Sequence, residues 1–373
     1  MRCYPDEILY KVQCSKPDVS LIPPDVSLIP PDVSLIPKEY PMVRREKSRK
    51  GFSLWGYLVS VSVMSVLLSL TKILLVSSSA TAAEVNTAKS FSGTRAMEYL
   101  EAICEFGPRP SGSIGMQKQR EFLIRYFQKA GAKVFRQAFR SRDGRNGEWI
   151  HMENLIVSWH PSRNDRVLLG AHYDTRPYPD RDRRQPKGIF VGANDGASGV
   201  AVLMELADSM SELKGSVGVD FVLFDAEEYV FEEGRDSYCL GSLFFARQYA
   251  ASRKAGAISY AYRCGVILDM VGDRNLAIWQ EHQSVEWPDT RPVVNSIWAT
   301  AEQLKVREFI SRPKYVINDD HVPLRMTGGI PTCDIIDFDY PHWHTTQDIP
   351  ANCSPKSLGV VGQVMLAWLQ ENY

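Results

Sequence analysis

Hydrophobic residues recur at two different spacings along this chain from Thr94 to its C-terminus. A spacing of about three to four residues is typical of amphipathic helices. It predicts helices over five segments: Ala96–Glu105, Gly115–Ala130, 196–213, 241–251 and Pro355–Asn372. Shorter apolar stretches predict five strands: Ala132–Phe139, Asn154–Trp159, Arg166–Ala171, Val219–Phe224 and Cys264–Leu268.

The last three of these predicted strands are almost continuously hydrophobic. Such strands are buried on both faces, which is characteristic of parallel sheets covered by helices. The alternation with helical segments therefore predicts an α/β fold, with a mostly parallel central sheet and helices on both faces. No long polar linker interrupts residues 85–373, so we expect a single globular domain there.

Residues 1–41 have a different pattern. From Pro17 to Pro37 one heptapeptide is repeated three times, and each copy contains two prolines. Two prolines per unit exclude a continuous helix, and with it a coiled coil. We interpret residues 1–41 as a low-complexity tract. Because a complete export signal begins at Met42, a further hypothesis is that this tract is a misassigned start.

Residues 42–84 have the layout of an export signal. Several basic residues precede an uncharged run over 51–71, and a stretch of small residues follows over 77–83. Such a segment is either a cleaved signal peptide or an uncleaved anchor, here over residues 52–76, and both alternatives are open. In either case the basic flank stays inside the cell. We therefore expect an exported domain, either secreted or periplasmic, or held at the membrane through this segment alone.

Composition narrows the range of partners. The 43 basic and 44 acidic residues nearly cancel, so nothing in the overall charge predicts binding to nucleic acid. The seven cysteines include no C-x-x-C pair, which argues against a zinc knuckle or a dense disulfide framework. Five of them follow residue 84, so at least one lacks an intramolecular partner. We expect a monomer that acts on a small, locally recognised substrate.

Polar residues follow each of the three most hydrophobic strands. In open α/β sheets, ligands bind beyond the carboxyl ends of the strands, so these residues are candidates for a site. A loop before the helix at 196–213 and two late loops add more. The candidates are His172, Asp174, Asp195, Asp225, Glu227, Glu228, Asp269, Asp319, Asp320, His321 and His344.

Each candidate by itself has a structural alternative. Asp195 precedes a predicted helix, where Asp is a favoured N-cap, and a single histidine is more often a hydrogen-bonded structural residue. Together, however, so many carboxylates at one sheet edge repel one another unless a cation offsets their charge or they retain protons. Carboxylates with imidazole and without thiolate suit zinc in a catalytic site. Adjacent side chains on an extended segment point in different directions, which lets one of Glu227 and Glu228 bind metal while the other moves protons.

These residues resemble the zinc aminopeptidase (M28-like) superfamily that includes the glutaminyl-peptide cyclotransferases, or glutaminyl cyclases. The resemblance covers roughly residues 95 to 370. It rests on the segments Ala171-His172-Tyr173-Asp174-Thr175-Arg176-Pro177, Gly192-Ala193-Asn194-Asp195-Gly196-Ala197-Ser198-Gly199, Phe224-Asp225-Ala226-Glu227-Glu228-Tyr229, Leu268-Asp269-Met270-Val271-Gly272, Asp319-Asp320-His321-Val322-Pro323 and Trp343-His344-Thr345.

The resemblance implies a role for each matching residue. Asp195, Glu228 and His344 correspond to zinc ligands, Glu227 to the general acid/base, and Asp269 and Asp319 to acids around the reacting nitrogen. The implied substrate pocket includes Asp320, His321 and Trp343, although Trp343 is also compatible with a core or rim position. One departure concerns the pocket rim, because Phe231, Glu232 and Glu233 stand where animal cyclases carry an additional tryptophan.

The activity that the resemblance implies is the cyclisation of an N-terminal glutamine to pyroglutamate, with release of ammonia and with one zinc ion as cofactor. The implied partners are peptides or proteins with a free N-terminal glutamine. The nearest alternative is a two-zinc aminopeptidase, in which His172 and Asp269 hold a second ion and Asp195 bridges the two. A non-catalytic, membrane-anchored binding domain would require a lost ligand or a lost base, and neither is lost.

Overall fold

A six-stranded sheet organises residues 90–373, the part of the chain that this computed structural model describes. The strands are β1 (Lys133–Arg142), β2 (Trp149–Trp159), β3 (Asp165–His172), β4 (Gly218–Phe224), β5 (Ala261–Asp269) and β8 (Thr332–Ile336), in the spatial order β1-β2-β4-β3-β5-β8. Strands β4, β3, β5 and β8 are parallel, whereas β1 and β2 form an antiparallel hairpin that pairs antiparallel with β4. The expected mostly parallel sheet is confirmed.

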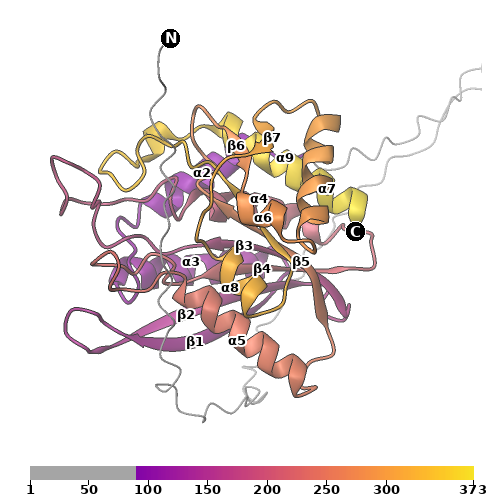
Figure 1. Ribbon diagram of the computed structural model, residues 1–373, viewed down its shortest axis with the longest axis horizontal. Helices are drawn as coiled ribbons and strands as arrows, with labels where there is room; N and C mark the ends of the chain where they lie inside the picture. Colours follow the sequence, from indigo (N-terminus) through magenta and orange to yellow (C-terminus); the bar gives the residue numbers. More distant parts are fainter. Residues whose placement is uncertain (1–89) are drawn as a thin grey trace, which may run out of the picture. The chain divides into compact units, whose positions relative to one another are not determined.

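Helices cover both faces of this sheet (Figure 1). One face carries α2 (Gly93–Cys104), α3 (Ile114–Lys129), α4 (Ser198–Met210), α7 (Arg291–Gln303) and α9 (Pro355–Asn372). The opposite face carries α5 (Leu240–Lys254) and α8 (His321–Met326). Three short elements lie at the β8 side: α6 (His282–Glu286) and the parallel pair β6 (Ile278–Gln280) and β7 (Phe309–Pro313). The predicted α/β architecture with two helical layers is therefore correct.

The continuous apolar runs of the central strands explain this layering. Successive side chains of a strand point to opposite faces, and in β3 Val167 and Leu169 belong to the core under α4, while Leu168 belongs to the core under α5. A strand that buries both faces is apolar at most positions; Arg166 of β3 and Asp220 of β4 are buried exceptions that pair with each other. Gly199 lets α4 approach β5 closely, because a Cβ atom there would lie 2.1 Å from the carbonyl oxygen of Leu268.

The predicted helix at 196–213 is shorter in the structure and begins at Ser198. Its N-cap is Ala197, and no side chain caps it, so Asp195 is free of the capping role that its position allowed. The elements between β5 and α9 were not predicted, including the 13-residue helix α7. Strand β8 has an acid, Asp334, at the centre of its five residues, which hides its apolar pattern.

Several predictions for the N-terminal region lie outside the described residues, namely those for 1–41, for the signal over 42–84 and for the anchor over 52–76. Within residues 90–373 no helix is long and apolar enough to cross a membrane. The five cysteines of this part, from Cys104 to Cys353, are all free thiols, which agrees with the expected absence of a disulfide framework there.

Candidate active site

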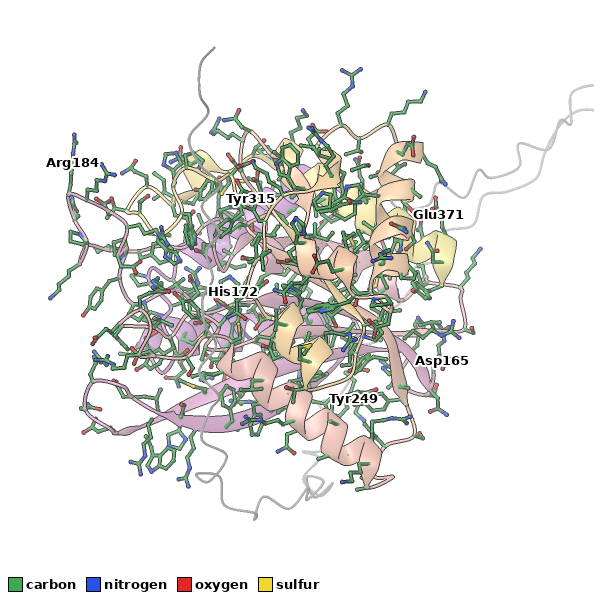
Figure 2. The ribbon with its side chains drawn as sticks, in the orientation of Figure 1. Asp165, His172, Arg184, Tyr249, Tyr315 and Glu371 are labelled. Carbon is green, nitrogen blue, oxygen red and sulfur yellow. The ribbon has the colours of Figure 1, made fainter. Side chains whose placement is uncertain are left out.

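The carboxyl ends of three neighbouring strands bring the predicted site residues together. His172 ends β3, Asp269 ends β5, and Glu227 and Glu228 follow β4 within four residues. Because β3 lies between β4 and β5, its histidine stands between the acids of its two neighbours. His172 is in the interior of the domain and is only 2% exposed (Figure 2). Ligand binding at this edge is the usual arrangement in open α/β sheets.

The backbone is strained at this edge. Three non-glycine residues adopt positive φ angles here: Ala226 at 61° and Met270 at 46°, each directly beside a candidate residue, and the candidate His344 at 55°. Conformations of this kind cost free energy and persist where the surrounding structure enforces them, often in active sites. Ala226 also bends the segment after β4, so Glu227 and Glu228 do not lie on the extended segment that the sequence predicted.

Asp195, Glu228 and His344 form one buried group. Each offers one ligand atom, and these atoms lie within 4.8 Å of one another. The Nε2 atom of His344 is 2.7 Å from Oε1 of Glu228 and 3.6 Å from Oδ2 of Asp195. Within residues 90–373, Oδ2 of Asp195 is buried and has no hydrogen-bond partner. The first and last of the three residues, Asp195 and His344, are 149 positions apart in the sequence, and only the tertiary fold brings the group together.

His172, Asp195 and Asp269 form a second group that shares Asp195 with the first. Nε2 of His172 is 3.1 Å from Oδ1 of Asp269 and 3.2 Å from Oδ1 of Asp195. The two carboxylate oxygens of Asp195 therefore face two different histidines. Both ligand sets that the sequence suggested, for one ion and for two, are present in the geometry.

Two further carboxylates hold the backbone of the candidate residues. Asp174 accepts hydrogen bonds from the N–H groups of Glu227 (3.0 Å) and Glu228 (3.2 Å). Asp348 accepts them from Asn194 (2.8 Å) and Asp195 (3.1 Å). Charge-assisted bonds of this type are shorter and stronger than neutral ones. They therefore fix the backbone positions of Asp195, Glu227 and Glu228.

Glu227 and Glu228 have different partners. Glu228 accepts the backbone N–H of Arg176 at 3.1 Å and contacts His344. Glu227 instead accepts a hydrogen bond from the thiol of Cys239, whose Sγ atom is 3.4 Å from Oε1. Burial raises the pKa of Glu227 well above its usual value; the charge of His172 opposes this shift, and the charge of Asp319 adds to it.

The late acidic segment lies behind Glu227. Asp319 groups with Glu227 and Cys239, and its pKa is raised to about 6, first by burial and then by the charge of Asp269. Asp320 and His321 are completely buried, and the backbone N–H of Asp320 donates to Oδ1 of Asp319 at 2.5 Å. Their side chains therefore do not reach an open surface.

Two aromatic residues were expected near the substrate pocket, Trp343 and Phe231. The half-buried Trp343 has its ring centroid 4.2 Å from that of His344 and 4.7 Å from that of Phe338. Phe231 lies in the stretch where animal cyclases carry an additional tryptophan. Its ring packs edge-on against those of Tyr229 and Tyr178, with centroids 5.1 Å and 6.2 Å away. Phe231 therefore belongs to a cluster of three aromatic rings with Tyr178 and Tyr229.

Sequence reasoning missed four residues that contact this group: Asp180, Cys239, Asp334 and Asp348. Asp180 is 3.1 Å from Nδ1 of His344, and Asp334 groups with Asp319 and His321. An acid inside the apolar segment Thr332–Ile336 was a usable signal for Asp334. The other three lie in loops or before a helix, where acids and cysteines carry no particular pattern.

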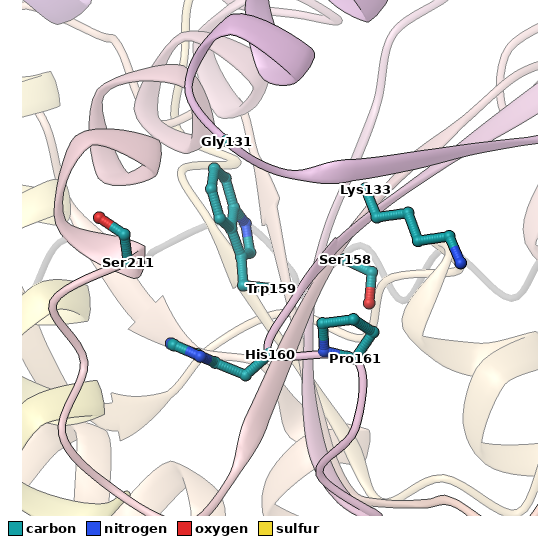
Figure 3. A pocket seen from close by; sticks show the side chains of 7 residues that line it. All are labelled: Gly131, Lys133, Ser158, Trp159, His160, Pro161 and Ser211. Atoms are coloured by element: carbon teal, nitrogen blue, oxygen red, sulfur yellow. The ribbon is translucent and has the colours of Figure 1, made fainter. Parts of the chain in front are cut away.

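A separate pocket of about 230 Å³ lies at the opposite edge of the sheet (Figure 3). Its lining includes Lys133 from the start of β1, Trp159 from the end of β2 and His160, which directly follows β2. Trp159 pairs with Val219 near the start of β4, which places this pocket at the amino ends of the parallel strands. None of its lining residues is acidic, so it offers no set of metal ligands.

Fold and site together define an α/β protein with a buried carboxylate–imidazole centre at the carboxyl ends of its parallel strands. A model of peptidase family M28 matches residues 154–369. The chain belongs to this family, in the branch that contains the glutaminyl cyclases.

Individual relatives support the assignment. A glutaminyl cyclase of Fimbriiglobus ruber is 37% identical, with a TM-score of 0.72, and the match covers 76% of this chain and 97% of that one. A zinc-dependent exopeptidase of Parabacteroides distasonis is 30% identical, with a TM-score of 0.70, covering 76% and 100%. The glutaminyl-peptide cyclotransferase of Drosophila melanogaster is 24% identical over 262 residues, which are 65% of this chain and 70% of that protein.

Proposed function

We propose that this protein cyclises the N-terminal glutamine of peptides to pyroglutamate. In this reaction the α-amine nitrogen attacks the side-chain amide carbon, a new C–N bond closes a five-membered ring, and the bond to the amide nitrogen breaks. One proton passes from the amine to the leaving nitrogen, which departs as ammonia. The observation that carries the proposal is the buried group of Asp195, Glu228 and His344 beside Glu227, in a chain 37% identical to a glutaminyl cyclase.

We assign zinc to Asp195, Glu228 and His344. Two carboxylates and one imidazole are a ligand set that zinc uses in catalytic sites with an open position. The unpartnered Oδ2 of Asp195 fits this assignment, because a buried charged oxygen without a hydrogen bond is unfavourable unless something else compensates it. When bound, zinc acts as a Lewis acid that polarises the substrate's amide carbonyl.

Glu227 is assigned as the residue that moves the proton. It takes the proton from the α-amine and returns it to the leaving nitrogen, which is general acid/base catalysis by one carboxylate. Two hydrogen bonds hold it in position: its own backbone N–H donates to the Asp174 carboxylate, and the Cys239 thiol donates to the Glu227 carboxylate. Asp269 and Asp319 are assigned to hold the leaving nitrogen, and Trp343 to form the apolar wall for the glutamine stem.

Asp320 and His321 were expected in the substrate pocket. Their complete burial and the bond from the Asp320 N–H to Asp319 favour a supporting role behind Asp319 instead. We keep them in the proposed site as positioning residues and not as groups that touch the substrate.

The remaining proposals concern the whole protein. We propose that it is exported, acts as a monomer on peptide substrates without nucleic acid, and meets the membrane only through its N-terminal segment. Sequencing the N-terminus of the natural product tests export: a start after residue 84 supports cleavage, and a start at residue 1 in the cytoplasm contradicts the proposal.

The test of the activity is ammonia release from a glutaminyl dipeptide, with and without a chelator. We expect ammonia and a pyroglutamyl product, loss of both with the chelator, and recovery on adding back one equivalent of zinc. A two-zinc aminopeptidase would instead release free amino acids, bind two ions and leave the glutaminyl peptide uncyclised. That second outcome would overturn the assignment.

A further inference from the structure

Basic residues surround a pocket beside the candidate active site. The pocket has a volume of about 400 Å³ and lies between the loop over 181–185 and the loop over 341–347. Arg181, Arg183 and Arg184 line it from the first loop, and His342 lines it from the second. The three arginines are exposed, and Arg184 projects outward at the edge of the domain (Figure 2).

These three guanidinium groups have no acidic partner within residues 90–373. Nearby Arg176 shows the contrast, because its buried guanidinium pairs with Asp180 at 2.8 Å and with Glu233 at 3.2 Å. The overall charge of the chain is −1, so a cluster of three unpaired cations around one pocket is a local feature and not a consequence of a basic protein. Such a cluster attracts anionic groups.

The one acid of the 181–185 loop, Asp182, accepts hydrogen bonds from both loops. The carboxylate of Asp182 accepts bonds from the N–H groups of Arg184 (2.9 Å) and Gln185 (3.0 Å) and from the N–H (3.1 Å) and hydroxyl (2.5 Å) of Thr346. These donors, the Thr346 hydroxyl first, hold the pKa of Asp182 well below its usual range. Asp182 therefore ties the two loops together and leaves the arginines available.

The pocket adjoins the proposed glutamine site. The guanidinium carbon of Arg181 lies 3.9 Å from the centroid of the Trp343 ring, and the N–H of Arg181 donates to the carbonyl of His344 at 3.1 Å. His342 and Thr345, which line the pocket, flank Trp343 and His344 in the chain. An extended peptide advances about 3.3–3.6 Å per residue, so the residues just after a bound glutamine are within reach of this pocket.

We propose that this basic pocket binds an acidic side chain of the substrate, at one of the two positions that follow the N-terminal glutamine. The inference rests on the proposed function and adds a substrate class to it: glutaminyl peptides with Asp or Glu at the second or third residue. Planar guanidinium groups suit carboxylates because they can donate two parallel hydrogen bonds.

The test uses tripeptide amides, so that the only carboxylate is the one under study. Gln-Glu-Ala amide is compared with Gln-Gln-Ala amide, and Gln-Ala-Glu amide with Gln-Ala-Gln amide; each pair differs by charge and hardly by shape. We expect kcat/KM at low ionic strength to be about 5- to 10-fold higher for the acidic member of at least one pair, the size expected for a few exposed ion pairs. The ratio should approach one at about 1 M salt, because screening weakens exposed pairs.

The double variant Arg183→Glu with Arg184→Glu tests whether these two arginines cause the preference for acidic peptides. Both side chains are exposed, so we expect a folded protein whose acidic-to-neutral ratio falls below one. The matched control is Lys118→Glu with Arg125→Glu on α3, two exposed cations outside the pocket, which changes the net charge by the same amount and should keep the preference.

Two outcomes overturn the inference while the proposed function stands: equal cyclisation of acidic and neutral peptides by the parent, or an equal loss of preference in both double variants. Failure of all four peptides to cyclise, with release of free amino acids, would instead overturn the proposed function. The two kinds of failure are therefore distinguishable.

Discussion

The amino ends and the carboxyl ends of the parallel strands bury charged residues in opposite ways. At the amino ends of the parallel strands, Arg166 of β3 pairs with Asp220 of β4, and both side chains are at most 4% exposed. Nε of Arg166 donates to Asp220 at 2.8 Å, and its other N–H groups donate to Ser158 and to four backbone carbonyls. The hydroxyl of Tyr262 donates to the same Asp220 at 2.6 Å. The protein satisfies this pair by itself.

At the carboxyl ends, buried acids outnumber buried cations and several polar atoms lack partners. Oδ2 of Asp195, Oδ2 of Asp319 and both carboxylate oxygens of Asp320 are buried without a hydrogen bond within residues 90–373. Burial is the main cause of the raised pKa values of Asp195, Glu227 and Asp320. Buried charge that is fully paired serves structure, whereas buried charge left unpaired is costly and marks a site that something else completes.

The largest effect that this comparison predicts is on catalysis. Replacing Glu227 by Gln removes the proton acceptor, so we expect kcat for a glutaminyl dipeptide to fall by roughly two to four orders of magnitude. Because the variant also removes an acid that repels Asp319 and Glu228, its free energy of unfolding in urea should stay equal or rise. Glu121→Gln, the same change on a half-exposed side chain of α3, should keep kcat. A kcat within tenfold of the parent would contradict the assignment of Glu227.

At the amino ends of the strands, a substitution should lower stability and leave kcat nearly unchanged. Asp220→Ala leaves the guanidinium of Arg166 buried without its acid, and we expect the free energy of unfolding to fall by about 3–5 kcal/mol. The kcat of the folded fraction should be close to that of the parent, because Asp220 is at the other end of the sheet from Glu227. A large loss of kcat without a loss of stability would show that the two edges are not separate in function.

Stabilisation by zinc should depend on residues at the carboxyl ends of the strands and not on residues at the amino ends. A ligand that binds the native state at about 100 to 1,000 times its Kd adds about 3–4 kcal/mol to the free energy of unfolding. We expect this increment in the parent and in Asp220→Ala, and its loss in His344→Ala. Thermal unfolding of the chelated and the zinc-loaded proteins measures it. If the increment persists in His344→Ala, the zinc ion does not bind at Asp195, Glu228 and His344 as assigned.

The smallest effect is expected on the surface. Arg263 and Asp165 also form an ion pair between neighbouring strands, but both side chains are about half exposed (48% and 55%). Asp165→Ala should lower the free energy of unfolding by only about 0–1 kcal/mol, since water solvates the charge that remains. Urea denaturation of Asp165→Ala and Asp220→Ala under the same conditions compares the two losses of stability directly. A cost similar to that of Asp220→Ala would show that burial does not govern these pairs.

Much of the fold was predictable because its signals are local. The apolar runs that became β3, β4 and β5 and the periodic segments that became α2, α3 and α9 carry their pattern in consecutive residues. The short α6, α8 and β8 were missed, because five or six residues are too few to establish a period and Asp334 interrupts the apolar pattern of β8. The 13-residue α7 was missed as well, and shortness does not explain it.

For the site, the sequence by itself determined which residue types could gather at one edge: acids and histidines after each hydrophobic strand, in an order that resembles the glutaminyl cyclases. Only the tertiary structure decided their distances, the bend at Ala226, and the contacts of Glu227 with Cys239 and of Asp348 with the Asp195 backbone. The physical reason is that hydrophobic periodicity is encoded between near neighbours in the chain, whereas a hydrogen bond between loops depends on how the whole core packs.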